Sequence, residues 1–232
     1  MIKRLLITLS TCTLAFSSLQ AASLVDGTEI GFDFGSAGTV AAPDTPNWNV
    51  NLAALSGTIN AGSLIDTSGV VVDGVGFTWS GATASGTQGD FISGTPAVIP
   101  ETAALDNLVA NAPGGSLVLT LTGLDDALLY DITVGHGNDA ASGNTDTTWT
   151  ITGTAFSFTT DASVGANAYA QFSGVSTNGS GQIEITSAGA GGNLNISAVS
   201  GLYVAAIPEQ STYALIGGLL AMGLAINRRR KR

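Results

Sequence analysis

Apolar and polar residues alternate along much of the chain between residues 23 and 206. The run Glu29–Phe34 places Ile30, Phe32 and Phe34 on one side of an extended segment. The same alternation recurs in further runs: Trp48–Leu52, Val75–Trp79, Leu117–Leu121, Tyr130–Val134, Trp149–Ile151, Phe156–Phe158, Ile183–Ile185 and Val199–Val204. Each run predicts a short strand with one apolar face.

Glycine-rich turn signals separate these runs, among them Asp73-Gly74, Asn178-Gly179 and Gly191-Gly192. A strand with one apolar face must bury that face against another layer, and two packed antiparallel sheets do this. The sequence shows no internal repeat and no linker. We therefore predict one all-β domain over residues 23–206, an antiparallel two-sheet sandwich.

One short helix is expected in this domain. Leu105, Leu108 and Val109 have helical spacing, Pro100 precedes the segment, and Pro113 with two glycines ends it. The preceding stretch, residues 82–100, has little periodicity and is expected to be a long loop.

The N-terminus has the layout of a secretory signal peptide. Lys3 and Arg4 precede an apolar run over Leu5–Phe16, and small residues follow it. Cleavage after Ala21 or Ala22 is expected, which makes residues 1–22 the signal segment. Export would then proceed through the Sec translocon.

The C-terminus carries a second apolar run, Thr212–Ile226, followed by five basic residues. Fifteen helical residues rise about 22 Å, which is short against a bilayer core of about 30 Å. The basic residues fix the orientation, with the C-terminus in the cytoplasm and the body outside. We expect a helix over about 212–227 that anchors the precursor in the inner membrane.

The order of features in residues 207–232 resembles the PEP-CTERM sorting signal, although Gln210 stands where that pattern has a second proline. The resemblance implies recognition by an exosortase, a membrane-embedded protease-transpeptidase. It also implies transfer of the body to the cell surface or to an extracellular polysaccharide matrix. The residues that carry the resemblance are Pro208, Glu209, Ser211, Thr212, Arg228, Arg229 and Arg230.

All seven Lys and Arg side chains lie in the two terminal segments, whereas the seventeen acids lie between Asp26 and Glu209. The body can therefore form no salt bridge to Lys or Arg, and its fold must rest on apolar burial and hydrogen bonds. An acidic body without basic residues excludes nucleic acid as a partner, since such binding needs Lys and Arg. The only cysteine, Cys12, lies in the signal segment, so the body has no disulfide.

A second resemblance covers most of the body. The segments Trp48-Asn49, Leu64–Gly69, Leu121–Asp125 and Leu129–Ile132, with the Ile183 strand and the closing Val199–Val204 strand, are similar to galactose-binding-like jelly-roll domains. Domains of that type often accompany polysaccharide-active enzymes or occur on cell surfaces. The resemblance implies the sandwich fold and leaves the ligand open.

Catalytic residues are not expected. The body has one histidine, His136, predicted to lie in an exposed loop after a strand, and it has no Gly-x-Ser-x-Gly elbow. Glycoside hydrolysis needs two opposed carboxylates, but Glu29, Glu101 and Glu184 belong to no motif. We expect that the protein is not an enzyme and has no cofactor.

Structural calcium is the one metal that the sequence leaves open. Calcium binds several carboxylate and carbonyl oxygens in a loop, and Asp125, Asp126, Asp139 and Asp146 lie in two acidic segments. Neither segment has EF-hand spacing, so we assign no metal ligand.

Sugar binding by stacking needs exposed aromatic rings. Trp48, Trp79 and Trp149 fall on the apolar phase of their strands and are expected in the core, whereas Tyr169 and Tyr203 are freer candidates. Our leading hypothesis is an exported, non-enzymatic protein of the cell surface or extracellular matrix. The alternative is a carbohydrate-binding module that attaches to exopolysaccharide.

Overall fold

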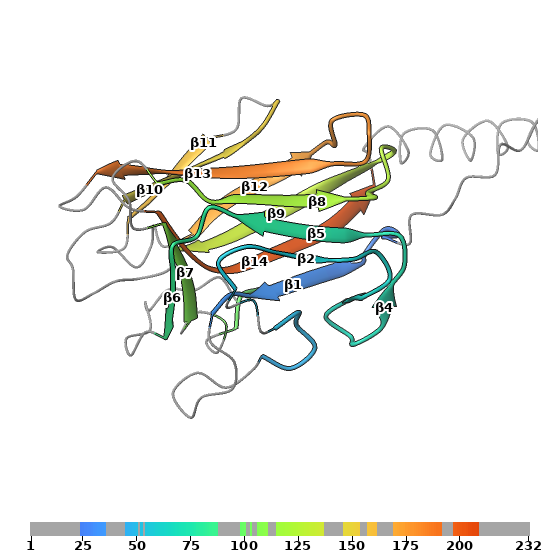
Figure 1. The fold of residues 1–232 in the computed structure, drawn as a ribbon. Helices are drawn as coiled ribbons and strands as arrows, with labels where there is room; N and C mark the ends of the chain where they lie inside the picture. Colours follow the sequence, from blue (N-terminus) through green and yellow to red (C-terminus); the bar gives the residue numbers. More distant parts are fainter. Residues whose placement is uncertain are drawn as a thin grey trace, which may run out of the picture.

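A computed structural model describes residues 24–35, 45–50, 52, 54–87, 98–100, 103, 106–110, 115–136, 146–153, 157–161, 169–191 and 197–208. These residues form two six-stranded sheets and a small two-stranded sheet (Figure 1). Every paired strand is antiparallel to its neighbours. The predicted all-β sandwich is confirmed for the described residues.

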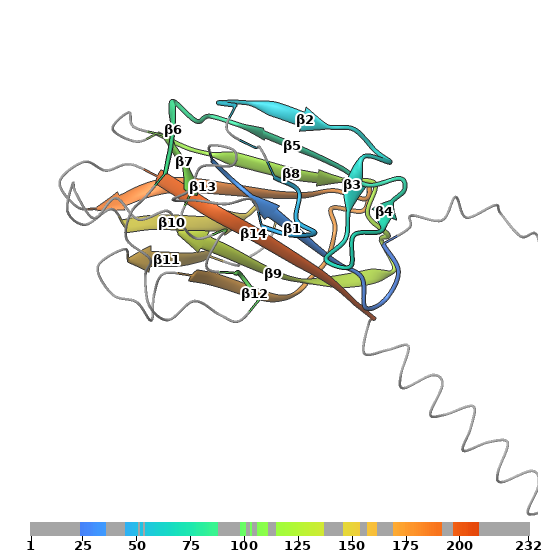
Figure 2. The same cartoon turned by 90° about the horizontal axis from the view of Figure 1, so that it is seen from below.

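The first sheet has the order β12-β9-β14-β7-β6, and β1 also pairs with β14. Its strands are β1 (Glu29–Asp33), β6 (Ala84–Thr87), β7 (Asp106–Ala110), β9 (Leu128–His136), β12 (Tyr169–Val175) and β14 (Ser197–Pro208). The long strand β14 is central, because β9 lies along one edge of it while β7 and β1 share the other. The first and last strands of the body are therefore neighbours (Figure 2).

The second sheet has the order β11-β10-β13-β8-β5-β2. Its strands are β2 (Gly57–Ile59), β5 (Gly76–Ser80), β8 (Val118–Thr122), β10 (Asp146–Ile151), β11 (Ser157–Asp161) and β13 (Ile183–Gly191). The short strands β3 (Leu64–Ile65) and β4 (Val71–Val72) form a hairpin beside the first sheet. In Figures 1 and 2 this hairpin lies at the end of the sandwich where β1 begins and β14 ends.

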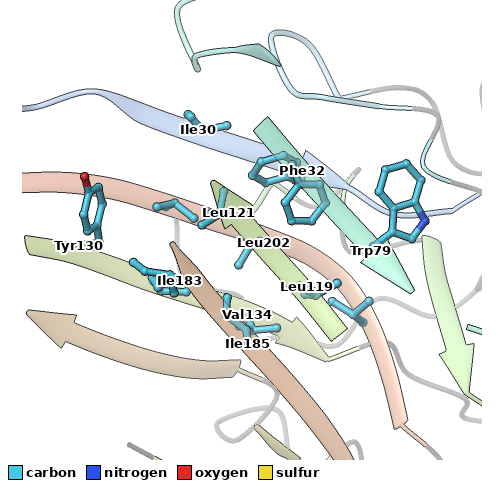
Figure 3. Close-up of a cluster of buried hydrophobic side chains, with 14 of the residues drawn as sticks. Ile30, Phe32, Trp79, Leu119, Leu121, Tyr130, Val134, Ile183, Ile185 and Leu202 are labelled. Carbon is cyan, nitrogen blue, oxygen red and sulfur yellow. The ribbon is translucent and has the colours of Figure 1, made fainter. Parts of the chain in front are cut away.

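The core lies between the two six-stranded sheets and consists of alternate residues from their strands (Figure 3). Trp149, Tyr130 and Phe32 are its largest fully buried side chains. The ring centroids of Phe32 and Phe77 lie 4.1 Å apart and join the first sheet to the second. The period-two alternation in the sequence thus marks the inward faces of β1, β5, β8, β9, β10 and β13 correctly. In β14 a register shift between Val199 and Gly201 changes the phase, so that Val199 and Leu202 both face the core.

Three local predictions were wrong. The second half of the expected helix is strand β7, in which Leu108 and Val109 face opposite sides as strand neighbours do. The expected long loop over residues 82–100 contains strand β6, which pairs with β7. The segment around Trp48 makes only an isolated bridge between Asn49 and Phe32 and is not a full strand.

Candidate functional site

The two ends of the body lie at one end of the sandwich. The Gly27 amide donates to the Ala206 carbonyl over 2.9 Å, and the Ala206 amide donates to the Thr28 carbonyl over 3.0 Å. Turns that follow β8 and precede β13 meet at the same end, since the Leu124 amide donates to the Gly181 carbonyl. We call residues 24–28, 60–75, 123–127 and 176–182, together with Pro208, the tail end.

Pro208 is the one residue of the sorting motif that the structure describes. It is the last residue of β14 and pairs with Leu128, directly after the pair Ile207–Leu129. Strand β14 therefore continues two residues beyond the expected domain boundary at 206 and reaches the Pro-Glu step itself. No segment of loop separates the sheet from the sorting motif.

The other residues of the two terminal signals lie outside the described part of the chain. These are Ala21, Ala22, Glu209, Ser211, Thr212, Arg228, Arg229 and Arg230, together with the expected membrane helix over 212–227. Among the residues that the structure does describe, no helix is long and apolar enough to span a membrane.

Carboxylates at the tail end hold turns in place. Asp66 accepts hydrogen bonds from the Ser68 hydroxyl (2.6 Å) and the Val70 amide (2.9 Å), which closes the β3–β4 hairpin. The hydrogen bond from Ser68 is the main cause that lowers the pKa of Asp66. Asp126 accepts from the Thr177 hydroxyl and the Gly181 amide, and the bond from Thr177 is the main cause of its lowered pKa. These oxygens already have protein donors.

The calcium candidates do not converge. Asp126 is bonded to Gly181, just before β13 begins, whereas Asp146 pairs with Gly191 at the other end of β13. The nine residues of β13 lie between the two positions, and a strand of that length extends about 30 Å. Asp139 lies outside the described residues. In the described part of the chain, no three His, Cys, Asp or Glu side chains are grouped as metal ligands would be.

The three tryptophans are buried, as predicted, with exposed fractions of 6% for Trp48, 7% for Trp79 and 0% for Trp149. The prediction that Tyr169 and Tyr203 are freer was wrong, because both are buried. They pack with Trp48 and Ile99 in a second cluster. This cluster covers the outer face of the first sheet, so none of these rings is open for stacking on a sugar.

Gly31 makes room for Trp48 on that outer face. A Cβ atom on Gly31 would lie 2.3 Å from the Trp48 ring, whereas one on Gly201 would lie at an ordinary contact distance of 3.6 Å from it. The segment is then held by Asn49, whose side-chain amide donates to the Gly31 and Ile65 carbonyls and accepts from the Ile65 amide. The sequence analysis missed this anchor, although a glycine at the polar phase of a strand is a signal of close approach.

Buried polar groups stabilise the same region. The carboxylate of Asp33, 5% exposed, accepts a hydrogen bond from the Thr45 hydroxyl over 2.7 Å. Tyr203 lies near Glu29, and burial followed by its hydrogen bond with Glu29 raises the pKa of the Tyr203 hydroxyl. Neither Asp33 nor Thr45 was singled out from the sequence, because nothing in an alternating pattern distinguishes a buried acid from an exposed one.

The residues considered for catalysis lie apart. Glu29 projects from the outer face of the first sheet and Glu184 from the outer face of the second, where Glu184 accepts from the Thr152 hydroxyl over 2.9 Å. Opposite faces of a sandwich cannot form the paired carboxylates of a glycosidase. Glu101 lies outside the described residues. His136 is the last residue of β9, paired with Val199, which corrects its expected place in a loop.

Comparisons with known proteins give weak likenesses only. No family model matches the chain, and no curated protein matches it. Among solved structures, the carbohydrate-binding module CBM35 of Cellvibrio japonicus Abf62 is 15% identical, with a TM-score of 0.29 over 40% of this chain and 67% of that one. The truncated AlyQ protein with CBM32 and alginate lyase domains is 14% identical, with a TM-score of 0.32 over 57% of this chain and 34% of that one.

A calcium-binding mutant of β-glucuronidase 2 from Bacteroides uniformis is also similar, at 15% identity and a TM-score of 0.42. That match covers 68% of this chain but 18% of the β-glucuronidase, so the chain spans a small part of the enzyme.

Proposed function

We propose that this protein is exported, anchored as a precursor in the inner membrane, and sorted through its C-terminal signal to the cell surface or extracellular matrix. The proposal rests on the positions of the basic residues in the sequence and on the order of the strands in the first sheet. All seven basic residues lie in the two terminal segments, and the body between them begins and ends at one end of the sandwich. Both signals can therefore stay at the membrane while the body lies outside.

The distance between the body and the expected membrane helix supports this arrangement. Only Glu209, Gln210 and Ser211 separate the last residue of β14 from the apolar run that starts at Thr212. Three residues and their flanking bonds span about 14 Å when fully extended. The tail end of the precursor would thus face the membrane at short range, with the sorting motif between them.

We propose a non-enzymatic role for the body, as a sandwich of jelly-roll type. The described carboxylates of Glu29 and Glu184 lie on opposite faces, and this separation supports a structural or binding role. A carbohydrate-binding module is the second candidate. The described tryptophans and tyrosines are buried and do not favour it, but the threonine-rich outer face of the second sheet does.

Deletion of the exosortase-type protease from the native host tests the sorting step. In the parent strain, we expect a shortened protein on the cell surface or in the matrix. In the deletion strain, the full-length chain should accumulate in the inner-membrane fraction. A full-length protein outside the cell in both strains would contradict the proposal.

The basic residues provide a second test of topology. Replacing Arg228, Arg229, Arg230, Lys231 and Arg232 with neutral residues removes the charges that hold the C-terminus in the cytoplasm. We expect the short apolar run to cross completely, which would expose a C-terminal epitope to protease added outside the inner membrane. An epitope that stays protected would show that other features fix the orientation.

A further inference from the structure

The outer face of the second sheet consists largely of threonine. In β5, β8 and β13 the side chains of Phe77, Leu119 and Ile185 point into the core, so their strand neighbours point outward. Together with those of β2 and β10, these outward positions hold seven threonines beside residues such as Ser80, Val118 and Glu184. The threonines are Thr58, Thr78, Thr120, Thr122, Thr148, Thr150 and Thr186. We call this surface the threonine face.

The threonines form rows across the strands. Thr58 pairs with Thr78, Thr78 pairs with Thr120, and Thr120 pairs with Glu184. Strands lie about 4.8 Å apart, so this row extends about 14 Å from β2 to β13. A parallel row joins Ser80, Val118, Thr186 and Thr150. In this second row Val118 has no hydroxyl, and the Thr186 hydroxyl donates to the Thr150 carbonyl over 3.4 Å. The first row is therefore the one that presents hydroxyls at regular intervals along a line.

The hydroxyls of the first row are available for a ligand. Within the described residues, the side chains of Thr58, Thr78 and Thr120 make no hydrogen bond to the protein. Thr58 is exposed, and Thr78 and Thr120 are half-buried. Each hydroxyl can both donate and accept, so the row can bind either kind of partner group.

Charge is absent from the part of the threonine face that β2, β5 and β8 form, because these strands contain no charged residue. The rest of the second sheet contains three acids, which are Glu184 in β13, Asp146 at the start of β10 and Asp161 at the end of β11. The first sheet carries Glu29, Asp33, Asp106 and Asp131, and the tail end carries Asp26, Asp66, Asp73, Asp125 and Asp126. A polymer that lies over β2, β5 and β8 can therefore bind without the desolvation of a carboxylate, whereas an anionic chain would be repelled by the acids on the rest of the body.

We propose that the threonine face binds an uncharged polysaccharide, in an extended chain that lies across the strands. The sugar hydroxyls would exchange hydrogen bonds with the rows of threonine hydroxyls. The described tryptophans and tyrosines are buried, so this binding uses hydrogen bonds and methyl contacts without ring stacking. The inference rests on the proposed role in the extracellular matrix and adds to it the contact surface and the class of ligand.

A single hydrogen bond between a sugar and a threonine is weak, so binding depends on the length of the polymer. A net hydrogen bond changes an affinity by about 2- to 12-fold, so one sugar on one threonine gives no useful binding. A polymer that contacts both rows gains from many such bonds at once, because each later contact is intramolecular. We therefore expect retention by long chains and no measurable binding of the free monosaccharide.

Affinity electrophoresis of the full chain tests the proposal. The protein, kept soluble in a zwitterionic detergent, migrates through native gels that contain dextran, hydroxyethyl cellulose or galactomannan. We expect at least one of these neutral polymers to retard it, and alginate, which is anionic, to leave its mobility unchanged. Mobility that none of the three neutral polymers changes would overturn the proposal.

Paired variants locate the binding. The double variant Thr78→Val, Thr120→Val keeps β-branched side chains at half-buried strand positions but removes two hydroxyls. We expect it to weaken retardation about tenfold or more. Thr28→Val makes the same chemical change at the tail end and should leave retardation as it was. A melting temperature equal to that of the parent protein would show that the double variant is folded. If the double variant does not fold, Thr58→Val, at an exposed position of the edge strand β2, should weaken retardation in its place.

Three other results would assign the face to a different partner or show which of the two proposals fails. If the double variant dissociates an oligomer in light scattering and changes no polymer binding, the face contacts a second copy of the chain and the proposal fails. If the tail is removed normally but no polymer is bound, only this inference fails. If polymer is bound but the tail stays in place, only the proposed sorting fails.

Discussion

At the scale of single residues, Trp149 is the clearest test of the core. Its side chain is fully buried in β10 and belongs to the main hydrophobic cluster. Trp149→Ala removes a large apolar volume, and we expect the free energy of unfolding to fall by about 3–5 kcal/mol. Urea unfolding followed by circular dichroism measures it. A change under about 0.5 kcal/mol, typical of surface sites, would place Trp149 on the surface.

Gly31 tests the packing of Trp48 on the first sheet. A Cβ atom at this position would lie 2.3 Å from the Trp48 ring, so the ring would have to move. We expect Gly31→Ala to destabilise the protein by about 1–3 kcal/mol, the usual range for overpacking. The same substitution at Gly27 would meet no atom within 4 Å, although its positive φ of 81° makes it an imperfect control. Equal stability of Gly31→Ala and the parent protein would contradict the packing described for Trp48.

The buried hydroxyl of Tyr130 should make the stability of the protein fall at alkaline pH. Burial is the main cause that raises the pKa of Tyr130 from 10.0 to about 12, and its hydroxyl exchanges hydrogen bonds with the backbone of Asp125. Because the folded protein holds this proton more tightly, the stabilisation is complete below pH 10 and is lost as the pH rises through 10 to 12. The loss should reach about 3 kcal/mol.

Melting curves between pH 8 and pH 12 measure this dependence. No lysine or arginine lies between Leu5 and Asn227, so the other groups of the body that titrate in this range are tyrosines. The pKa of Tyr203 is also raised by burial, and Tyr203 should account for the decline that remains in Tyr130→Phe. Tyr130→Phe should be less stable at pH 8 but should show a shallower decline above pH 10. A decline of the same steepness in both proteins would show that Tyr130 is not responsible.

At the scale of elements, the end of β14 limits where the tail can be cut. Strand β14 lies between β9 and β1, and its pairing continues to Pro208. A protease could reach bonds before Pro208 only by pulling a central strand out of the sheet. We therefore expect cleavage after Pro208, which leaves β14 whole. Cleavage at or before Ala206 would mean that the tail is removed before the sheet has formed.

The strands themselves show what the sequence could predict. Alternation identified β1, β5, β8 and β13 because one face of each is buried and the other is not. It could not place β6, whose residues Ala84–Thr87 are small and carry no alternating apolar pattern. It assigned β7 to a helix because Leu105, Leu108 and Val109 satisfy helical spacing. The run is too short to distinguish the helical period of 3.6 residues from the strand period of 2.

The candidate surfaces were less predictable than the strands. Tyr169 and Tyr203 fall on the outward phase of their strands, and nothing in the sequence shows that Trp48 and Ile99 cover them. The threonine rows depend on pairing between strands far apart in the sequence, such as Thr58 with Thr78 and Thr78 with Thr120. Alternation within one strand shows which residues point outward but not which residues become neighbours.

At the scale of the whole molecule, electrostatic repulsion should govern stability and solubility. The chain has seventeen acids, and cleavage before Glu209 would leave sixteen in a body without Lys or Arg. Like charges without cations oppose the compact state. Salt screens them, since the Debye length falls from about 30 Å at 0.01 M to about 10 Å at 0.1 M.

We therefore expect the melting temperature to rise with added sodium chloride. Millimolar calcium at matched ionic strength should raise it further, because a divalent ion can bridge acids. Near pH 4, where Asp and Glu begin to protonate, repulsion falls and the body should self-associate, which light scattering would detect. A melting temperature that does not change with salt would show that the acids lie too far apart to matter. No difference between calcium and sodium would exclude bridging.

The mass of the intact protein at the cell surface tests the central claim most directly. If the chain is exported and sorted as proposed, the mature protein begins after Ala21 or Ala22 and ends between Pro208 and Ser211, alone or joined to a surface group. Mass spectrometry of the purified surface form resolves both termini in one measurement. A surface form that still ends at Arg232 would contradict the account, because it would show that the C-terminal segment is a permanent anchor.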